Sequence, residues 1–322
     1  MNEERKDWLE RDKRYGENRV VGTIEQGSRG RGLVGSPSAY GFRETTGQIN
    51  WIYERIMRII RAIGRAVLSK LGLQDLFEIR FQEGNMPSPA KLRFLCWYLK
   101  LARILATRGI APPLSLNSVE MAARWRENPP SALCHYVALD PRVDCFFSDV
   151  ISLLDKESPI LEIGCNRGRA LQWLRNYGYT HLTGIEIGKE ALELMETTFP
   201  GLRQYARIIE GNAPEVIHSF PDKSYDLVFT RSVLVNIGVR YNDIFREMCR
   251  VSRRFILIME NENSYMAYPR DFQSLFERWG FKEIMSRTIR PDATLPVPFT
   301  DKDIFKTAVL RLFVIDQSCL SA

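Results

Sequence analysis

One acid and two glycines lie at alternate positions in the stretch EIGCNRG, between an apolar run and a helix-like segment: Glu162, Gly164, Asn166 and Gly168. Glycines at a strand-to-helix turn let the backbone approach a ligand closely, and the start of the helix offers free N–H groups. The stretch departs from the dinucleotide-binding pattern G-x-G-x-x-G, because a carboxylate lies inside the strand end. That carboxylate would repel a pyrophosphate and accept a hydrogen bond from an amine. The spacing therefore predicts a site for an amine-bearing ligand.

Two later strand ends carry polar side chains of complementary chemistry. Glu186 ends the next apolar run, where a carboxylate can accept hydrogen bonds from both hydroxyls of a ribose. Asn212 follows the third run and begins a helix, where its amide suits the edge of an adenine; a simple helix N-cap is the alternative. Because the carboxyl ends of parallel strands meet at one edge of a sheet, we expect these residues to share one cleft.

The elements that must position these residues follow from the hydrophobic pattern. From Pro159 onward, apolar runs alternate with amphipathic segments of helical length, such as KEALELMETTF and NDIFREMCRV. Strands that alternate with helices predict right-handed βαβ units and a mostly parallel sheet. The predicted strands are PILEI, LTGIEI, ARIIE, YDLVF, RFILIME, FKEIM and TAVLRLFVI.

Composition divides the chain into three predicted parts. Residues 1–49 are polar and Gly-rich without a period, which predicts a disordered arm. Residues 50–124 form a helical extension with two basic amphipathic stretches, 51–71 and 91–106. The apolar face of these helices either packs on the domain, the favoured interpretation, or leaves an arginine face that binds an anionic membrane. Residues 125–318 hold the α/β domain.

Length and charge limit the possible classes of protein. The chain has 322 residues, a net charge of +6 and six cysteines. It has no apolar run of the roughly 20 residues that a membrane span needs, and its start lacks a signal-peptide core. We therefore expect a cytoplasmic protein, with peripheral membrane contact through residues 51–106 as an addition. The cysteine spacing predicts free thiols and no metal site, and no nucleic-acid-binding module is recognisable.

These motifs, in this order, resemble those of a class I S-adenosylmethionine-dependent methyltransferase over roughly residues 125–290. Within that family the chain looks closest to small bacterial enzymes. The resemblance implies a Rossmann-like sheet of seven strands, mostly parallel, with S-adenosyl-L-methionine as the cofactor. It places Glu162 and Gly164 near the methionine moiety, with Glu186 on the ribose. The residues expected to bind the cofactor are Glu162, Gly164, Cys165, Asn166, Gly168, Glu186, Ile187, Asn212, Ala213, Thr230 and Ser232. Arg142 is a further candidate for the cofactor or a substrate carboxylate, with a solvated arginine at a helix start as the alternative.

Two positions depart from the family pattern. Asn212 stands where relatives more often have Asp, and Asn236 stands where many carry His, so the usual candidate for a general base is missing. His135, in the segment that should cap the site, is the remaining candidate, with packing as the alternative. The residues expected to contact the substrate are Arg231, Asn236, Tyr268 and Arg270.

The resemblance implies methyl transfer to a small-molecule, glycan or lipid-precursor acceptor, with O-methylation slightly favoured over N-methylation. A non-catalytic scaffold that binds the cofactor is the first alternative, because the histidine is missing at Asn236. A nicotinamide-dependent oxidoreductase is the second, and it is disfavoured because G-x-G-x-x-G is absent. The sequence does not indicate an oligomeric state.

Overall fold

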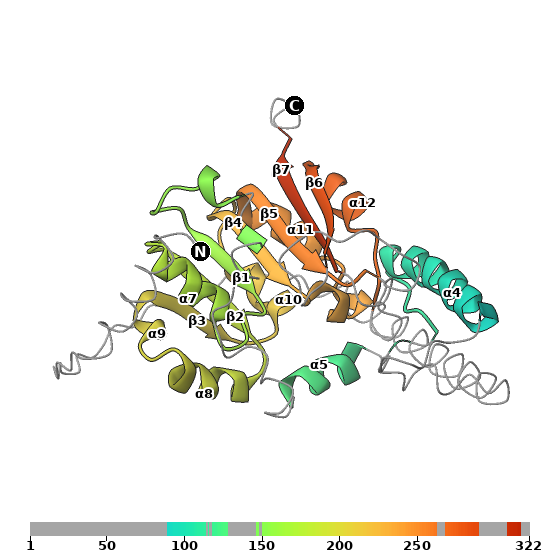
Figure 1. Ribbon diagram of the computed structural model, residues 1–322, viewed down its shortest axis with the longest axis horizontal. Coiled ribbons are helices and arrows are strands. Elements are labelled where there is room, and N and C mark those ends of the chain that lie inside the picture. The colour runs from blue at the N-terminus through green and yellow to red at the C-terminus, as the bar shows by residue number, and fades with distance from the viewer. Residues whose placement is uncertain are drawn as a thin grey trace, which may run out of the picture. The chain divides into compact units, whose positions relative to one another are not determined.

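The computed structural model describes residues 89–113, 115, 118–127, 146–147, 150–262, 268–289 and 308–316. Within these residues, seven strands form one sheet in the order β3-β2-β1-β4-β5-β7-β6 (Figure 1). The seven predicted strands are therefore confirmed. The predicted arm, residues 1–49, and the predicted helix at residues 51–71 lie outside the described residues.

Five strands of the sheet are parallel neighbours, from β3 to β5. β7 is antiparallel to both β5 and β6. The strand order reverses between β1 and β4, which is where open α/β sheets leave a crevice beyond the carboxyl ends of the strands. The strands are β1 (Ile160–Ile163), β2 (Leu182–Glu186), β3 (Ala206–Glu210), β4 (Tyr225–Arg231), β5 (Ser252–Glu260), β6 (Phe281–Ile289) and β7 (Ala308–Ile315).

Helices cover both faces of this sheet. Their bounds are α4 (Pro89–Thr107), α5 (Ser118–Arg126), α7 (Arg169–Asn176), α8 (Lys189–Thr198), α9 (Leu202–Tyr205), α10 (Ala213–Val216), α11 (Ile244–Val251) and α12 (Phe272–Glu277). Short 3₁₀ turns lie at Ile151–Leu153, Ile217–Ser219, Leu234–Asn236 and Val239–Tyr241. Because strand residues alternate in direction, Val228 of β4 joins the core on one face, while Leu227 and Phe229 join the core on the other.

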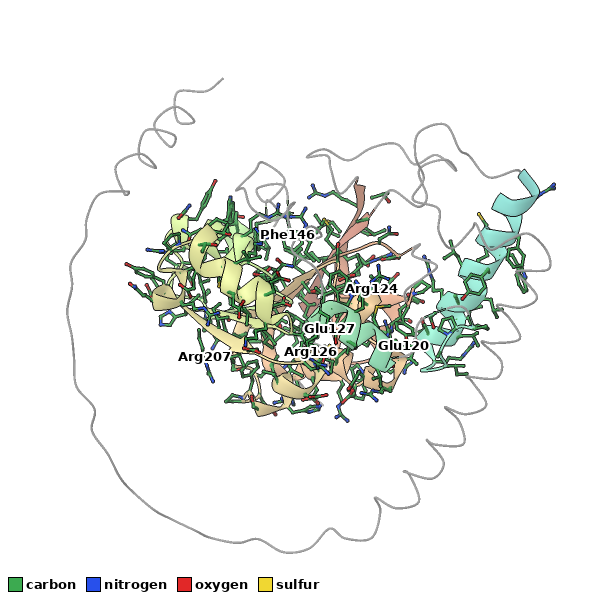
Figure 2. The ribbon with its side chains drawn as sticks, turned by 90° about the horizontal axis from the view of Figure 1, so that it is seen from below. Glu120, Arg124, Arg126, Glu127, Phe146 and Arg207 are labelled. Atoms are coloured by element: carbon green, nitrogen blue, oxygen red, sulfur yellow. The ribbon has the colours of Figure 1, made fainter. Side chains whose placement is uncertain are left out.

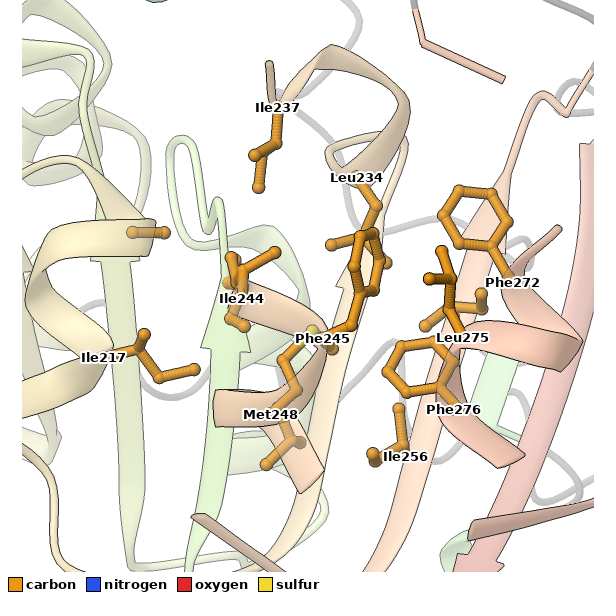
Figure 3. Packing of buried hydrophobic residues seen from close by; sticks show 14 of the residues in the cluster. Ile217, Leu234, Ile237, Ile244, Phe245, Met248, Ile256, Phe272, Leu275 and Phe276 are labelled. Atoms are coloured by element: carbon orange, nitrogen blue, oxygen red, sulfur yellow. The ribbon is translucent and has the colours of Figure 1, made fainter. Parts of the chain in front are cut away.

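The core beneath α11 and α12 is built mainly from aromatic and branched side chains. Phe245 of α11 contacts Phe276 of α12 edge to face, with ring centroids 5.6 Å apart (Figure 3). Leu234 and Ile237, which follow β4, belong to the same buried cluster. Packing of this core therefore reaches the loop at the carboxyl end of β4.

Helix α4 corresponds to the stretch predicted at residues 91–106. It is joined to the domain by hydrogen bonds from Arg103 Nη2 to Glu262 O, 3.2 Å, and from Asn242 Nδ2 to Ala106 O, 2.8 Å. Trp97 and Ile104 of this helix are exposed. None of the helices in the described part of the chain combines the length and the apolar character that crossing a membrane requires.

Candidate functional site

A cleft of about 810 Å³ lies at the carboxyl ends of β1, β2, β3 and β4. The predicted residues that line it are Gly164, Asn166, Glu186, Ile187, Asn212, Ala213, Arg231, Ser232 and Asn236. The structure thus brings together residues from four separate strand ends.

A smaller cavity of about 430 Å³ adjoins this cleft. Its lining shares Gly164, Asn166 and Arg231 with the cleft and adds two further predicted residues, Glu162 and Cys165. The two spaces therefore meet at the EIGCNRG turn. We refer to them below as the main cleft and the side cavity.

Glu186 joins the EIGCNRG turn to the end of β2. Its Oε2 accepts a hydrogen bond from Asn166 N at 2.7 Å, and its Oε1 accepts one from Gly188 N at 2.8 Å. Burial raises the pKa of Glu186, while these backbone N–H groups act in the opposite direction. A carboxylate has about four acceptor sites, so Glu186 keeps acceptor capacity for a ligand in the main cleft beside its bonds to Gly188, Asn166 and Ile187.

The turn itself has left-handed backbone at three positions, Gly164, Asn166 and Gly168. Gly164 has φ +74°, and a Cβ at this position would lie 2.4 Å from Val233 Cγ2. Asn166 has φ +50°, a region that asparagine tolerates better than most residues, and its Oδ1 accepts a hydrogen bond from Arg167 N at 2.8 Å. The turn consequently lies directly against the loop that follows β4.

The side cavity contains two buried charged side chains with unpaired atoms. Glu162 and Arg167 are 5% and 7% exposed, and neither Glu162 Oε2 nor Arg167 Nε has a hydrogen-bond partner among the described residues. Burial raises the pKa of Glu162, and the neighbouring carboxylate Glu186 raises it further, while Arg169 lowers it. An unpaired acceptor and an unpaired donor in one cavity suit a ligand that carries both an ammonium and a carboxylate group.

Cys165 packs beneath the turn. Its side chain is 3% exposed and belongs to the buried cluster under α7 and α8. Burial raises the pKa of the Cys165 thiol well above its ordinary value, and Glu162 and Glu186 raise it further. The thiol is therefore protonated near neutral pH and unsuited to act as a nucleophile.

Asn212 lies in the main cleft just after β3, which is separated from β1 by β2 in the sheet. Its Nδ2 donates to Glu215 Oε1 at 2.9 Å, and Tyr241 Oη donates to the same oxygen at 3.1 Å. Asn212 occupies the N-cap position of α10, but its side chain makes no capping hydrogen bond. The N-cap position is therefore confirmed without side-chain capping, and the Asn212 side chain is instead oriented by Glu215.

The loop after β4 is held by a buried carboxylate at the end of β5. Glu260 is fully buried, and it accepts hydrogen bonds from the N–H groups of Val233, Leu234 and Val235 at 3.0, 3.0 and 3.3 Å. Burial raises the pKa of Glu260 to about 7, although these three N–H groups lower it. Glu260 thus fixes the segment that lines the cleft opposite Glu186.

Arg270 holds the carbonyl side of the same loop. Its guanidinium donates to Leu234 O at 2.9 Å, Ile237 O at 2.6 Å and Asn242 Oδ1 at 3.0 Å. Arg270 is fully buried, and burial lowers its pKa to about 9. Together, Glu260 and Arg270 satisfy both the donors and the acceptors of this turn.

Several predicted site residues do not reach either space. Arg270 and Tyr268 are fully buried, so the prediction that they contact a substrate is corrected to a role in supporting the loop after β4. Thr230 is also fully buried, and its Oγ1 has no partner among the described residues. A Cβ on Gly168 would meet Leu202 Cδ2 at 2.5 Å, so this glycine allows close helix packing, and its contact with a cofactor stays a prediction.

The remaining predicted residues have mixed outcomes. Asn236 lines the main cleft, and its Nδ2 donates to Ser232 O at 3.0 Å, which leaves Oδ1 as an acceptor. Ser232 and Arg231 lie in the same lining. His135 and Arg142 lie outside the described residues, so their assignments stay predictions.

Sequence reasoning missed the contribution of α5 to the main cleft. Ser118, Ala122 and Trp125 of this helix all line it, as does Tyr241 beyond β4. The helix is short and precedes the strand-helix alternation by more than one break, so its pattern gives no sign of this position. The only sequence signal is its i, i+4, i+7 spacing, which is common to amphipathic helices.

Gly238→Ala is expected to displace α5 and lower the free energy of unfolding by about 1–3 kcal/mol through overpacking. A Cβ on Gly238 would lie 1.9 Å from Ser118 Oγ and 2.7 Å from Ser118 Cα. Because Gly238 has φ −60° and ψ 149°, alanine fits the backbone and the effect arises from this contact alone. Denaturant unfolding measures it, and adding Ser118→Gly should restore part of the loss. Unchanged stability of the single variant would contradict the placement of α5.

Comparisons with known proteins identify the family of the α/β domain. Residues 161–254 match the model of a methyltransferase domain family. The match begins in β1 and ends in β5, so it includes the strand ends that form the main cleft. No curated protein sequence matches the chain.

Similar solved structures share only distant likeness. A magnesium protoporphyrin IX methyltransferase from Synechocystis PCC 6803, solved with bound SAH, is 10% identical over 62% of this chain and 99% of that one, with a TM-score of 0.48. A TehB-like SAM-dependent methyltransferase from Corynebacterium glutamicum is 17% identical over 62% and 98%, with a TM-score of 0.43. The YcgJ protein from Bacillus subtilis is 13% identical over 55% and 98%, with a TM-score of 0.42.

Proposed function

The chain carries a class I S-adenosylmethionine-dependent methyltransferase domain. We propose that the protein transfers a methyl group to a small-molecule, glycan or lipid-precursor acceptor. Oxygen is favoured over nitrogen as the accepting atom. One observation carries the proposal. Polar groups for an amino acid, a ribose and an adenine follow one another from the side cavity, at Glu162, to the far end of the main cleft, at Asn212.

The side cavity fits the amino-acid end of the cofactor. Glu162 Oε2 offers an unpaired acceptor for an ammonium group, and Arg167 Nε offers an unpaired donor for a carboxylate. Gly164 lets the turn pack directly against Val233, because a Cβ there would lie 2.4 Å from Val233 Cγ2. A zwitterionic ligand would therefore satisfy two buried groups at once, which is favourable because unpaired buried polar atoms are costly.

The main cleft fits the nucleoside end. Glu186 would accept hydrogen bonds from ribose hydroxyls while it continues to hold the N–H groups of Asn166 and Gly188. Asn212 Oδ1 would accept from the adenine amino group, since its Nδ2 is engaged by Glu215. Ile187, Ala213 and Pro214 supply apolar surface for the base.

When bound, the cofactor supplies an electrophilic methyl group on a sulfonium. The protein contributes mainly by holding donor and acceptor about 3–3.5 Å apart, which lowers the barrier without covalent help. Ionised oxygens and neutral amines need no base, whereas an aliphatic hydroxyl does. No histidine lies among the described residues that line the two spaces, so we assign His135 as the base for a hydroxyl acceptor.

Glu162→Gln is expected to weaken binding of S-adenosylhomocysteine by roughly 1–3 kcal/mol, because the ammonium group loses a charge-assisted hydrogen bond. The same variant should bind 5′-methylthioadenosine, which lacks the amino-acid group, as wild type does. Calorimetric titration of both ligands measures the difference. Equal weakening of both would contradict the assignment of the side cavity to the amino-acid end.

The reaction is tested by product formation with the full chain and S-adenosylmethionine. Separate panels of hydroxyl, carboxyl and amine compounds serve as acceptors, and release of S-adenosylhomocysteine is followed. Faster release with oxygen acceptors than with amines supports the proposal. Binding of the cofactor without release in any panel would overturn it in favour of a cofactor-binding scaffold.

A further inference from the structure

Helix α5 forms one wall of the main cleft although it precedes the strands that carry the motifs. Ser118, Ala122 and Trp125 lie at i, i+4 and i+7, on one face of the helix, and all three line the cleft. Charged residues occupy other positions, and all are exposed: Glu120, Arg124, Arg126 and Glu127 (Figure 2). The helix thus turns an apolar face with one indole toward the cleft.

The indole of Trp125 carries an unpaired donor. Its Nε1 is buried and has no hydrogen-bond partner among the described residues. Parts of the ring pack against the apolar core that includes Ile185 and Ala213. Buried indole N–H groups usually have a partner, so an unpaired one beside a cleft points to a ligand that completes it.

Close contacts fix α5 at both ends. A Cβ on Gly188 would lie 3.3 Å from Trp125 O, and a Cβ on Gly238 would lie within 2.7 Å of Ser118 Cα. Gly188 is also the residue whose N–H binds Glu186. Trp125 is consequently held beside the end of β2, at the part of the cleft assigned above to the ribose.

We propose that Trp125 is a ligand-binding residue of the main cleft, whose indole N–H donates a hydrogen bond to the nucleoside part of the cofactor. The inference rests on the proposed function and extends it to a residue outside the segment, 161–254, that matches the methyltransferase model. The acceptor is an oxygen or ring nitrogen of the nucleoside, since Trp125 lies beside Glu186 and not in the side cavity. The ring also covers apolar surface of the bound base.

Calorimetric titration of the full chain with S-adenosylhomocysteine and with 5′-methylthioadenosine tests the proposal. Trp125→Phe keeps an aromatic ring but removes the N–H together with the five-membered ring of the indole, and it should weaken binding of both ligands roughly three- to tenfold. Trp125→Ala should weaken them further. The matched control is Trp97→Phe on α4, where the indole is exposed, and it should bind both ligands as wild type does.

A second measurement does not depend on affinity. The chain has six tryptophans, and in a ¹⁵N-tryptophan-labelled sample the indole resonance that is lost in Trp125→Phe should shift and exchange more slowly when S-adenosylhomocysteine is added to wild type. Unchanged affinity in Trp125→Phe together with an unshifted resonance would overturn the inference and leave the proposed function standing. Failure of wild type to bind either ligand would overturn the proposed function and this inference with it.

Discussion

Replacing Glu260 by alanine is expected to lower the free energy of unfolding by about 3–5 kcal/mol, because three backbone N–H groups of the loop after β4 lose their acceptor. The carboxylate binds the N–H groups of Val233, Leu234 and Val235, of which the last two belong to buried residues. Arg270, on the carbonyl side of the same loop, would also lose a favourable charge. Denaturant unfolding at neutral pH measures the loss.

Glu260→Gln separates charge from shape in this test. Glutamine keeps one oxygen for Val233 and Leu234, but it turns an NH₂ group toward the N–H of Val235, so a smaller loss is expected. Lys189→Ala serves as the control, because that side chain is exposed and pairs with Glu193 in α8. If Glu260→Ala lowers the free energy of unfolding no more than Lys189→Ala does, the role of Glu260 in supporting the loop after β4 is contradicted.

The raised pKa of Glu260 gives this position a pH signature. Between its ordinary value of 4.5 and about 7, the folded chain retains a proton that the unfolded chain has released. The stabilisation is therefore fully present below pH 4.5 and is lost as pH rises through about 7. Burial also raises the pKa of Glu162 and Glu186, so these two groups add to the loss of stability as pH rises. Glu260→Gln should therefore reduce the dependence of the unfolding free energy on pH without abolishing it.

Glu186→Ala is expected to weaken binding of S-adenosylhomocysteine by roughly 1–3 kcal/mol or more, through loss of charge-assisted hydrogen bonds to the ribose. The same change releases the N–H groups of Asn166 and Gly188, so the EIGCNRG turn also loses its attachment to β2. Unlike Glu162→Gln, Glu186→Ala should weaken binding of 5′-methylthioadenosine as much as it weakens binding of S-adenosylhomocysteine. Calorimetry with both ligands measures this difference.

Glu186→Gln is the matched variant for this position. It keeps one acceptor oxygen and the volume of the side chain, and it should retain part of the affinity. Thermal unfolding of both variants shows whether the domain remains folded. Wild-type affinity in Glu186→Ala would remove Glu186 from the site.

The strands could be predicted from sequence because each is a local apolar run between turn signals. Their order could not be read locally: β7 lies between β5 and β6 because of contacts between distant segments. Local patterns report which residues can be buried, whereas neighbours in a sheet are chosen by packing across the whole domain.

The candidate site was predictable where a polar residue lies at or just after the carboxyl end of a strand, as at Glu162, Glu186 and Asn212. The same rule applies to Glu260, which ends β5, yet only the structure shows that this acid holds a loop and does not line the cleft. Trp125 was missed because its place depends on long-range packing of α5.

The central claim is that the main cleft and the side cavity bind the methyltransferase cofactor, and one calorimetric experiment tests it most directly. S-adenosylhomocysteine, NAD⁺ and NADP⁺ are titrated separately into the purified full chain. Micromolar binding of S-adenosylhomocysteine, with no binding of either dinucleotide, is the predicted result. Binding of a dinucleotide in its place, or no binding of any of the three, would contradict the account.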